Sequence, residues 1–79
     1  MYIVNKKQVE LIDGKLFAEA STLKLKPGEW PDHIAVVDDA GQGYLFQRGR
    51  IAVQPNGFEM VGYHYWARGT SVELFVAND

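Results

Sequence analysis

The fold class is decided by residues 9–18, which read VELIDGKLFA. The Asp13-Gly14 pair is a strong hairpin signal, because a type I′ turn needs a positive φ at both central residues. A two-residue loop at this pair places four apolar residues on one face of the hairpin: Val9, Leu11, Leu16 and Ala18. Glu10 and Lys15 then lie on the other face. Turn chemistry and hydrophobic alternation agree on one register, so we predict a β-hairpin here.

Turn signals recur along the rest of the chain at the spacing typical of a β meander or a small barrel. Pro55-Asn56-Gly57 fits a three-residue hairpin loop with Gly57 in the left-handed region. Gly49 indicates a bulge or a sharp bend. Further turns are expected at 39–43 and 67–69. The strands that they separate are expected at 33–38, 44–47, 50–54, 58–66 and 70–77.

Residues 20–31 interrupt this rhythm and are expected to form an ordered crossover loop over one open end of the sheet. Ser21 could cap a single helical or 3-10 turn at 21–25, which is too short for a longer helix. The run Lys26-Pro27-Gly28-Glu29 has Pro and Gly where a type II turn needs them. The following Trp30-Pro31 restricts Trp30 to an extended conformation. The expected anchors of the loop are Leu23, Leu25 and Trp30.

We therefore predict a single all-β domain over residues 1–79. It should contain six or seven short antiparallel strands in a bent sheet or small open barrel of SH3-like or OB-like size. At most one short 3-10 or helical turn is expected, near 21–25. The predicted core consists of Leu11, Leu16, Leu25, Ile34, Val36, Phe46, Ile51, Val53, Phe58, Met60, Leu74 and Val76. Resemblance in size and class carries no function with it.

Composition narrows the possible partners. The 79 residues include eight basic and ten acidic side chains, a formal net charge of −2. Duplex DNA and anionic membranes favour a clear basic excess, so neither is expected as a partner. Cysteine is absent, which excludes disulfides and cysteine-based zinc sites. The N-terminal residues do not resemble a signal peptide and no run has the length of a membrane span, so a cytoplasmic location is expected.

Residues 58–66 place large aromatic side chains on both faces of one strand. Strict alternation from Phe58 would turn His64 and Trp66 inward and leave Tyr63 and Tyr65 as a solvent-facing stripe. A bulge at Gly62 would exchange the two faces. One interpretation is that one set is core and the other packs against neighbouring strands. The other is an exposed aromatic platform for a partner, because Tyr and Trp are enriched at interface hot spots.

Three arginines at or near turns suggest an alternative function. Arg48 and Arg50 share a face if their strand is regular, and Arg68 lies near the next turn. Beside exposed tyrosines they could bind single-stranded RNA or DNA, with bases on the rings and phosphates on the guanidinium groups. The simpler interpretation is a solvated rim in which the arginines pair with Glu59, Glu73 or Asp79.

Catalytic and metal-binding patterns are weak. The Asp38-Asp39 stretch lacks the alternating oxygen ligands and the closing Glu of a calcium loop. Asp32-His33 and the distant His64 have no convincing third ligand. Ser21 and Ser71 lack a G-x-S-x-G context. Small β domains also rarely enclose the roughly 300 Å³ that a substrate pocket needs. We expect no enzyme activity, no cofactor and no bound metal.

The leading hypothesis is a non-enzymatic module that binds a protein partner, or a second copy of itself, through an aromatic sheet face. Unpaired sheet edges also invite the addition of a partner strand. The predicted contact residues are Trp30, Arg48, Arg50, Tyr63, Tyr65 and Trp66. The alternative is single-stranded nucleic acid bound by the same aromatics with Arg48, Arg50 and Arg68.

Overall fold

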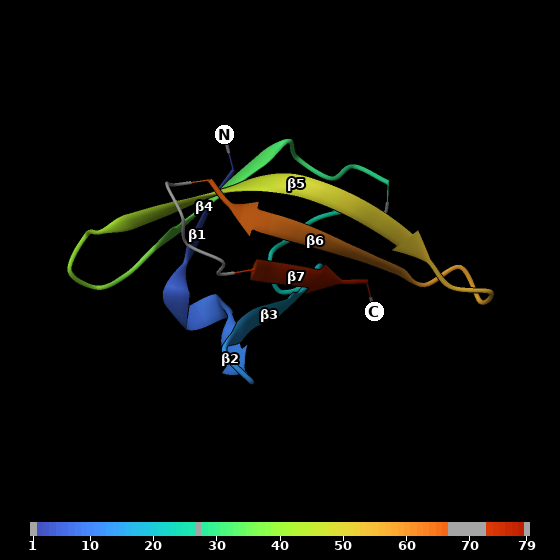
Figure 1. Cartoon of the computed structure of the whole chain (residues 1–79), viewed down its shortest axis with the longest axis horizontal. Coiled ribbons are helices and arrows are strands. Elements are labelled where there is room, and N and C mark those ends of the chain that lie inside the picture. Colours follow the sequence, from blue (N-terminus) through green and yellow to red (C-terminus); the bar gives the residue numbers. More distant parts are fainter. Residues whose placement is uncertain (1, 27, 67–72, 79) are drawn as a thin grey trace.

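A computed structural model describes residues 2–26, 28–66 and 73–78 of the chain, and these residues form one curled β-sheet (Figure 1). Its seven strands are β1 (Tyr2–Asn5), β2 (Glu10–Ile12), β3 (Lys15–Glu19), β4 (His33–Val37), β5 (Gly43–Val53), β6 (Glu59–Tyr65) and β7 (Glu73–Ala77). A single 3-10 turn, η1 (Lys6–Gln8), joins β1 to β2. These described residues contain no α-helix. The predicted all-β class is confirmed.

The sheet is mixed, and this corrects the antiparallel expectation. The strand order is β1-β4-β5-β6-β7-β3-β2. The strands from β4 to β7 form an antiparallel meander, and β2 and β3 form the predicted hairpin. However, β1 pairs with β4 and β3 pairs with β7 in parallel. Turn residues predict only the pairing of strands that are joined by short loops. These two pairings join strands that are far apart in the chain, so no local sequence pattern indicated them.

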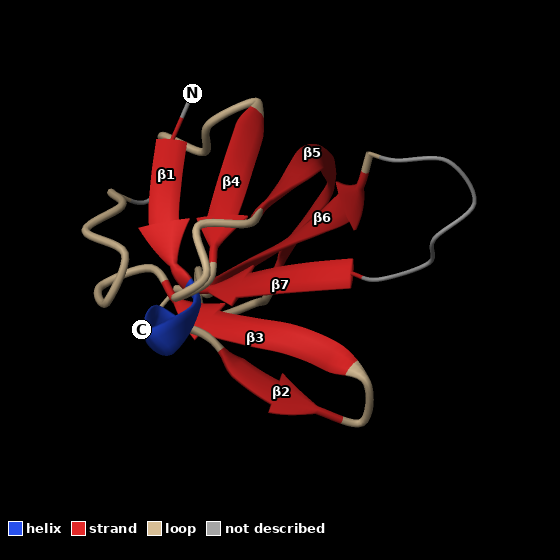
Figure 2. Ribbon diagram, turned by 90° about the vertical axis from the view of Figure 1, so that its left-hand side faces the viewer, coloured by secondary structure: helices blue, strands red, loops and turns tan. Residues whose placement is uncertain are grey.

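The curl of the sheet follows from its connectivity. β1 and β2 are consecutive in the chain but lie at opposite edges of the sheet. In a flat seven-stranded sheet the two edges would be about 29 Å apart, whereas the link from Asn5 to Glu10 spans at most about 18 Å. The sheet must therefore bend until the end of β1 and the start of β2 lie within the reach of this link, although the two edge strands do not pair with each other. Figure 2 shows β1 and β2 converging on η1 from opposite sides.

The short helix η1 has a local cause that the sequence prediction missed. The Asn5 side chain accepts a hydrogen bond from the Lys7 amide, and the Gln8 side chain accepts one from the Asn5 amide, each at 2.9 Å. This reciprocal capping box stabilises a single turn. Near 21–25, where at most one short turn was expected, residues 20–24 form hydrogen-bonded turns and no helix. The Leu23 amide donates to the Glu19 carbonyl at 3.2 Å, the Lys24 amide to the Ser21 carbonyl at 3.1 Å and the Leu25 amide to the Ala20 carbonyl at 2.8 Å, and Lys24 has a positive φ of 59°.

The predicted hairpin turns are confirmed. Asp13 and Gly14 have φ values of 50° and 75°, and Leu11 faces Leu16. Gly57 has a φ of 85°, and its amide donates to the Gln54 carbonyl at 2.9 Å. The β5–β6 register shifts between Arg48 and Ile51, so the irregularity expected at Gly49 is present inside one long strand.

Other expected turns fall partly outside the described residues. Gly28 has a φ of 81°, and the Glu29 amide donates to the Lys26 carbonyl at 3.1 Å, as a type II turn requires. Pro27, the turn at 67–69 and the first residues of the strand expected at 70–77 lie outside the part that the structure describes.

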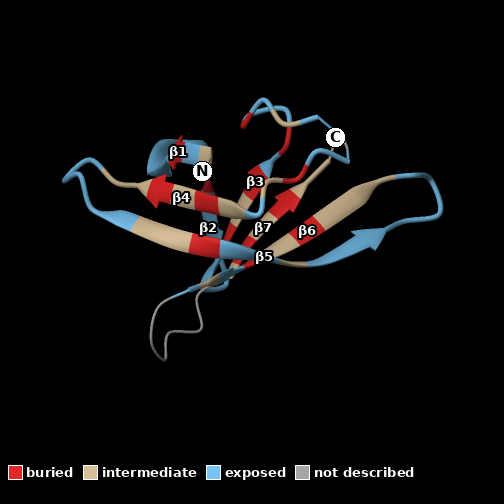
Figure 3. Cartoon of the chain, turned by 90° about the horizontal axis from the view of Figure 1, so that it is seen from above, coloured by how far each residue is buried: buried red, intermediate tan, exposed pale blue. Residues whose placement is uncertain are grey.

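Half of the predicted core is correct. Leu16, Ile34, Val36, Phe46, Leu74 and Val76 are buried, and Leu25, Phe58 and Met60 are partly buried. Leu11, Ile51 and Val53 are exposed, so their assignment to the core is wrong. Ile51 and Val53 pair with Val61 and Glu59 and share their face, but the β5–β6 hairpin projects past the other strands (Figures 1 and 3). Buried residues absent from the prediction include Val4, Val9, Ala18, Ala20, Val61 and Tyr63, and the expected loop anchors Leu23 and Trp30 are also buried.

Candidate functional site

The two faces of β6 are assigned by burial. Val61 and Tyr63 are buried and Tyr65 is partly buried on the concave face, while His64 and Trp66 are exposed. The solvent-facing stripe of Tyr63 and Tyr65 expected from strict alternation is therefore wrong. β6 keeps a regular register with β7, so no bulge at Gly62 causes the change.

This orientation places Glu59 at an inward position of β6. Its carboxylate accepts hydrogen bonds from the Trp30 indole nitrogen at 2.8 Å and from the Gly28 amide at 3.1 Å. Because these donors satisfy the charged group, a carboxylate can occupy the concave face. The register then puts residues 59, 61, 63 and 65 inward. The sequence pattern does not show that the crossover loop supplies these donors. It therefore favours the opposite assignment, in which Phe58 and Met60 face inward and Glu59 faces solvent.

Three of the predicted contact residues meet in a structural clamp between the crossover and the sheet. The Tyr63 hydroxyl donates to the Pro31 carbonyl at 2.9 Å, and Arg48 Nη1 donates to the Trp30 carbonyl at 2.6 Å. Arg48 Nη2 also pairs with the Asp32 carboxylate at 3.0 Å. Burial raises the pKa of Tyr63 to about 12, and the nearby Arg48 charge only partly opposes this rise. Trp30 and Tyr63 are buried, so the expectation that they form an exposed contact surface is wrong.

The concave side of the sheet contains an open hollow of about 600 Å³. Its lining comprises Lys6, Leu11, Gly14, Leu16, Val36, Tyr44, Phe46 and Tyr65. The Tyr65 ring lies 5.9 Å from the Tyr44 ring and 5.6 Å from the Phe46 ring, in tilted and edge-on arrangements. Leu11 stands at the wall with 70% of its surface exposed. The hollow is open to solvent and is not an enclosed cavity.

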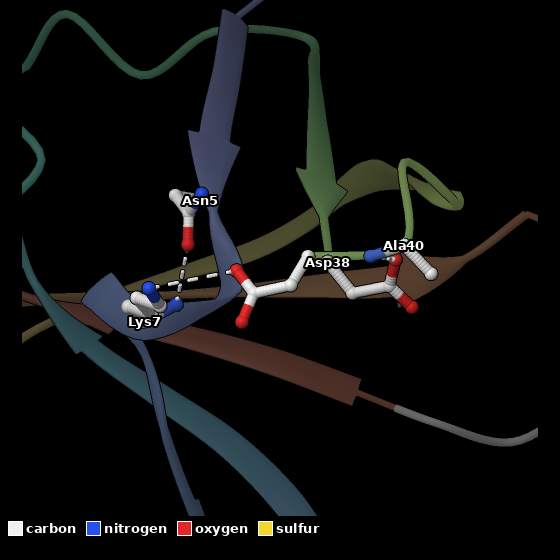
Figure 4. Close-up of polar contacts among 5 residues, drawn as sticks. Asn5, Lys7, Asp38 and Ala40 are labelled. Carbon is white, nitrogen blue, oxygen red and sulfur yellow. Dashed lines mark hydrogen bonds and ion pairs between the residues drawn. The ribbon is translucent and has the colours of Figure 1, made fainter.

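η1, whose Lys6 lines the hollow, lies beside the β4–β5 turn. Lys7 lies 3.7 Å from the Asp39 carboxylate, and the Asp38 carboxylate accepts a hydrogen bond from the Ala40 amide (Figure 4). The Asp38 carboxylate also accepts a hydrogen bond from the Gln42 amide. Lys6 is the one charged residue among the described lining residues and makes no ion pair within the described part of the chain. The described lining holds no carboxylate, imidazole, serine or threonine. Its chemistry suits the binding of an apolar group.

The remaining predicted contact residues lie elsewhere. Arg50 is exposed on the convex face, beside Met60, His64 and Phe75. Trp66 is 63% exposed, with its ring 5.7 Å from the His33 ring. The bulge at Gly49 separates Arg48 and Arg50 onto opposite faces, contrary to the regular-strand expectation. Arg68 lies outside the described residues. Of the six predicted contact residues, only Tyr65 lines the hollow.

Sequence reasoning missed most of the hollow, although two signals pointed toward it. The hairpin register had already placed Leu11 on the same face as Leu16. Tyr44 and Phe46 stand two residues apart in one strand, so they share a face with each other. Lys6 gave no signal of its own.

Wider features add little about the site. Among the described residues, no helix is long and apolar enough to span a membrane. No group of three or more metal-ligating side chains is present in the same residues. The chain matches no protein-family model, no curated protein and no solved structure.

Proposed function

We propose that this chain is a non-enzymatic interaction module that receives an apolar side chain of a protein partner in its concave hollow. The observation that carries the proposal is the pairing of an exposed Leu11 with an aromatic floor formed by Tyr44, Phe46 and Tyr65. Exposed apolar surface of this kind marks interaction sites. A large apolar side chain would bury both Leu11 and the rings.

The neighbouring strand supports the choice of a protein segment as the ligand. β2 is an edge of the sheet, and all three of its residues are exposed. An edge strand presents unpaired backbone groups that an extended segment can bind. Because side chains alternate along a strand, an added segment would direct every second side chain toward the face that Leu11 shares with the hollow.

The alternative of single-stranded nucleic acid has less support. Such binding combines stacking rings with cations that follow the backbone. The Arg48 guanidinium is already bonded to Trp30 and Asp32. Arg50 lies on the face opposite to Tyr65. Among the residues that the structure describes, Lys6 is then the one cation that lines the hollow.

The test uses two variants of the edge strand. Leu11 and Ile12 are adjacent, exposed and apolar, but they point to opposite faces of β2. A displayed library of linear peptides would be selected on the wild-type protein and then measured on Leu11→Glu and Ile12→Glu. We expect enriched peptides to contain a large apolar residue, to lose binding to Leu11→Glu and to keep it with Ile12→Glu.

Two results would contradict the proposal. One is that no peptide binds the wild-type protein. The other is that the enriched peptides bind Leu11→Glu as well as they bind the wild type. A fluorescent oligothymidylate and an oligouridylate serve as the second arm at low and high salt. Tight binding of either that weakens steeply with salt would favour the nucleic-acid alternative instead.

A further inference from the structure

We infer that the partner segment carries an acidic residue two positions from the apolar residue that enters the hollow, and that this acid meets Lys6. The inference rests on the proposed function and adds the charge and spacing of the bound segment. It comes from one cation at the edge of an otherwise apolar hollow.

The two lysines of the short helix η1 differ in their ion pairing. Lys6 and Lys7 are neighbours in η1, yet only Lys7 has an anionic partner among the described residues, Asp39 at 3.7 Å (Figure 4). Lys6 lines both the hollow and a shallower depression shared with the acidic turn. Its ammonium group is therefore available to a ligand at the mouth of the hollow.

Asp38 and Asp39 border one depression together with Lys6, and both carboxylates already have partners. Asp38 accepts two backbone hydrogen bonds of its own turn, at 3.0 Å and 2.9 Å. Asp39 is paired with Lys7. Glu10 faces Phe17 across the β2–β3 hairpin, on the side opposite to Leu11. The described residues thus supply no anion to the mouth of the hollow. We therefore expect an acidic group of the partner to pair with Lys6.

The geometry of an extended segment sets the spacing between its acidic and its apolar residue. The capping box of Asn5 and Gln8 fixes the turn that carries Lys6, immediately before the edge strand β2. In an extended segment laid along this edge, residues i and i+2 point to the same face, about 7 Å apart. An acid adjacent to the apolar residue would point away from the hollow. Specificity is therefore expected for an acid at i+2 or i−2.

The test uses fluorescein-labelled decapeptides with a central Phe in a neutral background. Members of the series carry Glu, Gln or Lys two positions from Phe, and a further pair carries Glu or Lys one position away. Binding is measured by fluorescence anisotropy on the wild type, on Lys6→Glu and on the matched Lys7→Glu variant. Circular dichroism checks that each variant is folded.

We expect the wild type to bind the Glu peptide about three- to tenfold more tightly than the Lys peptide when the charge is two positions away. Adjacent placement should show a smaller difference. Lys6→Glu should reverse the order, and Lys7→Glu should keep it. The preference should shrink as salt rises from about 50 to 300 mM, because both groups are near solvent.

The failures of the two proposals are distinguishable. The inference is overturned and the proposed function stands if the peptides bind the wild type and lose binding to Leu11→Glu, but show no charge preference that Lys6→Glu alters. An equal preference at adjacent and i+2 positions overturns the spacing. Should no peptide bind the wild type, the proposed function fails and the inference fails with it.

Discussion

Replacing Gly49 by alanine should destabilise the sheet, because the β5 bulge places this residue against β6. A Cβ atom at Gly49 would lie 2.5 Å from His64 Nε2 and 2.9 Å from the Gly62 carbonyl oxygen. Both distances are shorter than real Cβ contacts allow. Gly43 begins the same strand and has no heavy atom within 4 Å of an added Cβ, so Gly43→Ala is the matched control.

The two clashes differ in how they can relax. The His64 side chain is 62% exposed and could rotate away, at the loss of its 3.7 Å contact with Glu73. The Gly62 carbonyl belongs to the backbone of β6, which pairs with β5 on one side and β7 on the other. Moving it would disturb both ladders. Overpacking of this kind costs about 1–3 kcal/mol, and we expect most of the loss to persist in a His64→Ala background.

Urea unfolding followed by circular dichroism gives the free energy of unfolding for each variant. A thermal melt supplies a second measure, since each kcal/mol lowers Tm by about 4–8 °C in a domain of this size. The reasoning is refuted if Gly49→Ala is as stable as Gly43→Ala. If His64→Ala abolishes the cost of Gly49→Ala, the imidazole rather than the backbone is the obstacle.

Substitutions at two further positions, Tyr63 and Glu59, test the contacts that hold the crossover. Folding raises the pKa of Tyr63 from 10.0 to about 12, so the stability contributed by its protonated phenol is complete below pH 10 and is lost as pH rises through 12. The advantage in unfolding free energy of the wild type over Tyr63→Phe should thus fall by about 2 kcal/mol between about pH 9 and pH 11.5; an advantage independent of pH would contradict the burial of the phenol. Glu59→Ala should cost about 1–3 kcal/mol and Glu59→Gln less, because only the amide keeps an oxygen acceptor for the Trp30 indole. Urea unfolding monitored by Trp30 fluorescence in a Trp66→Phe background measures this difference, and equal losses for the two variants would show that the hydrogen bonds to Glu59 are not what matters.

The parts of the fold that sequence reasoning predicted correctly are those with local chemistry. Asp13-Gly14 and Asn56-Gly57 fix their turns because few residues tolerate a positive φ. The parallel pairing of β1 with β4 has no such signal, since it joins segments about thirty residues apart. The pairing depends on which arrangement buries Val4 against the core, and this is a property of the whole sheet.

The candidate site was harder to predict because the inward orientation of β6 places a carboxylate, Glu59, on the concave face, where a long-range contact satisfies it. The pattern of residues 58–66 favours Phe58 and Met60 inside, and a carboxylate at 59 argues against the opposite register. In the structure the Trp30 indole donates a hydrogen bond to the Glu59 carboxylate at 2.8 Å, so the carboxylate can lie on the concave face. Tyr63 then enters the core and Tyr65 reaches the hollow, while Trp66 is left in solvent. A contact between residues 29 positions apart thus accompanies the orientation of β6, and no local sequence pattern shows it.

The hollow and its cation have a common origin in the connectivity of the sheet. Because β1 and β2 are joined by a link shorter than the width of a flat sheet, the two edges must approach each other at η1. The same bend makes the inner face concave and brings Leu11 of β2 opposite Tyr44 and Phe46 of β5 around one hollow. It also fixes Lys6 at the hollow's edge, since Lys6 is the first residue of the link. A longer link would let the edges separate and move Lys6 away from the rings, so the length of this connection sets both the shape and the charge of the proposed binding site.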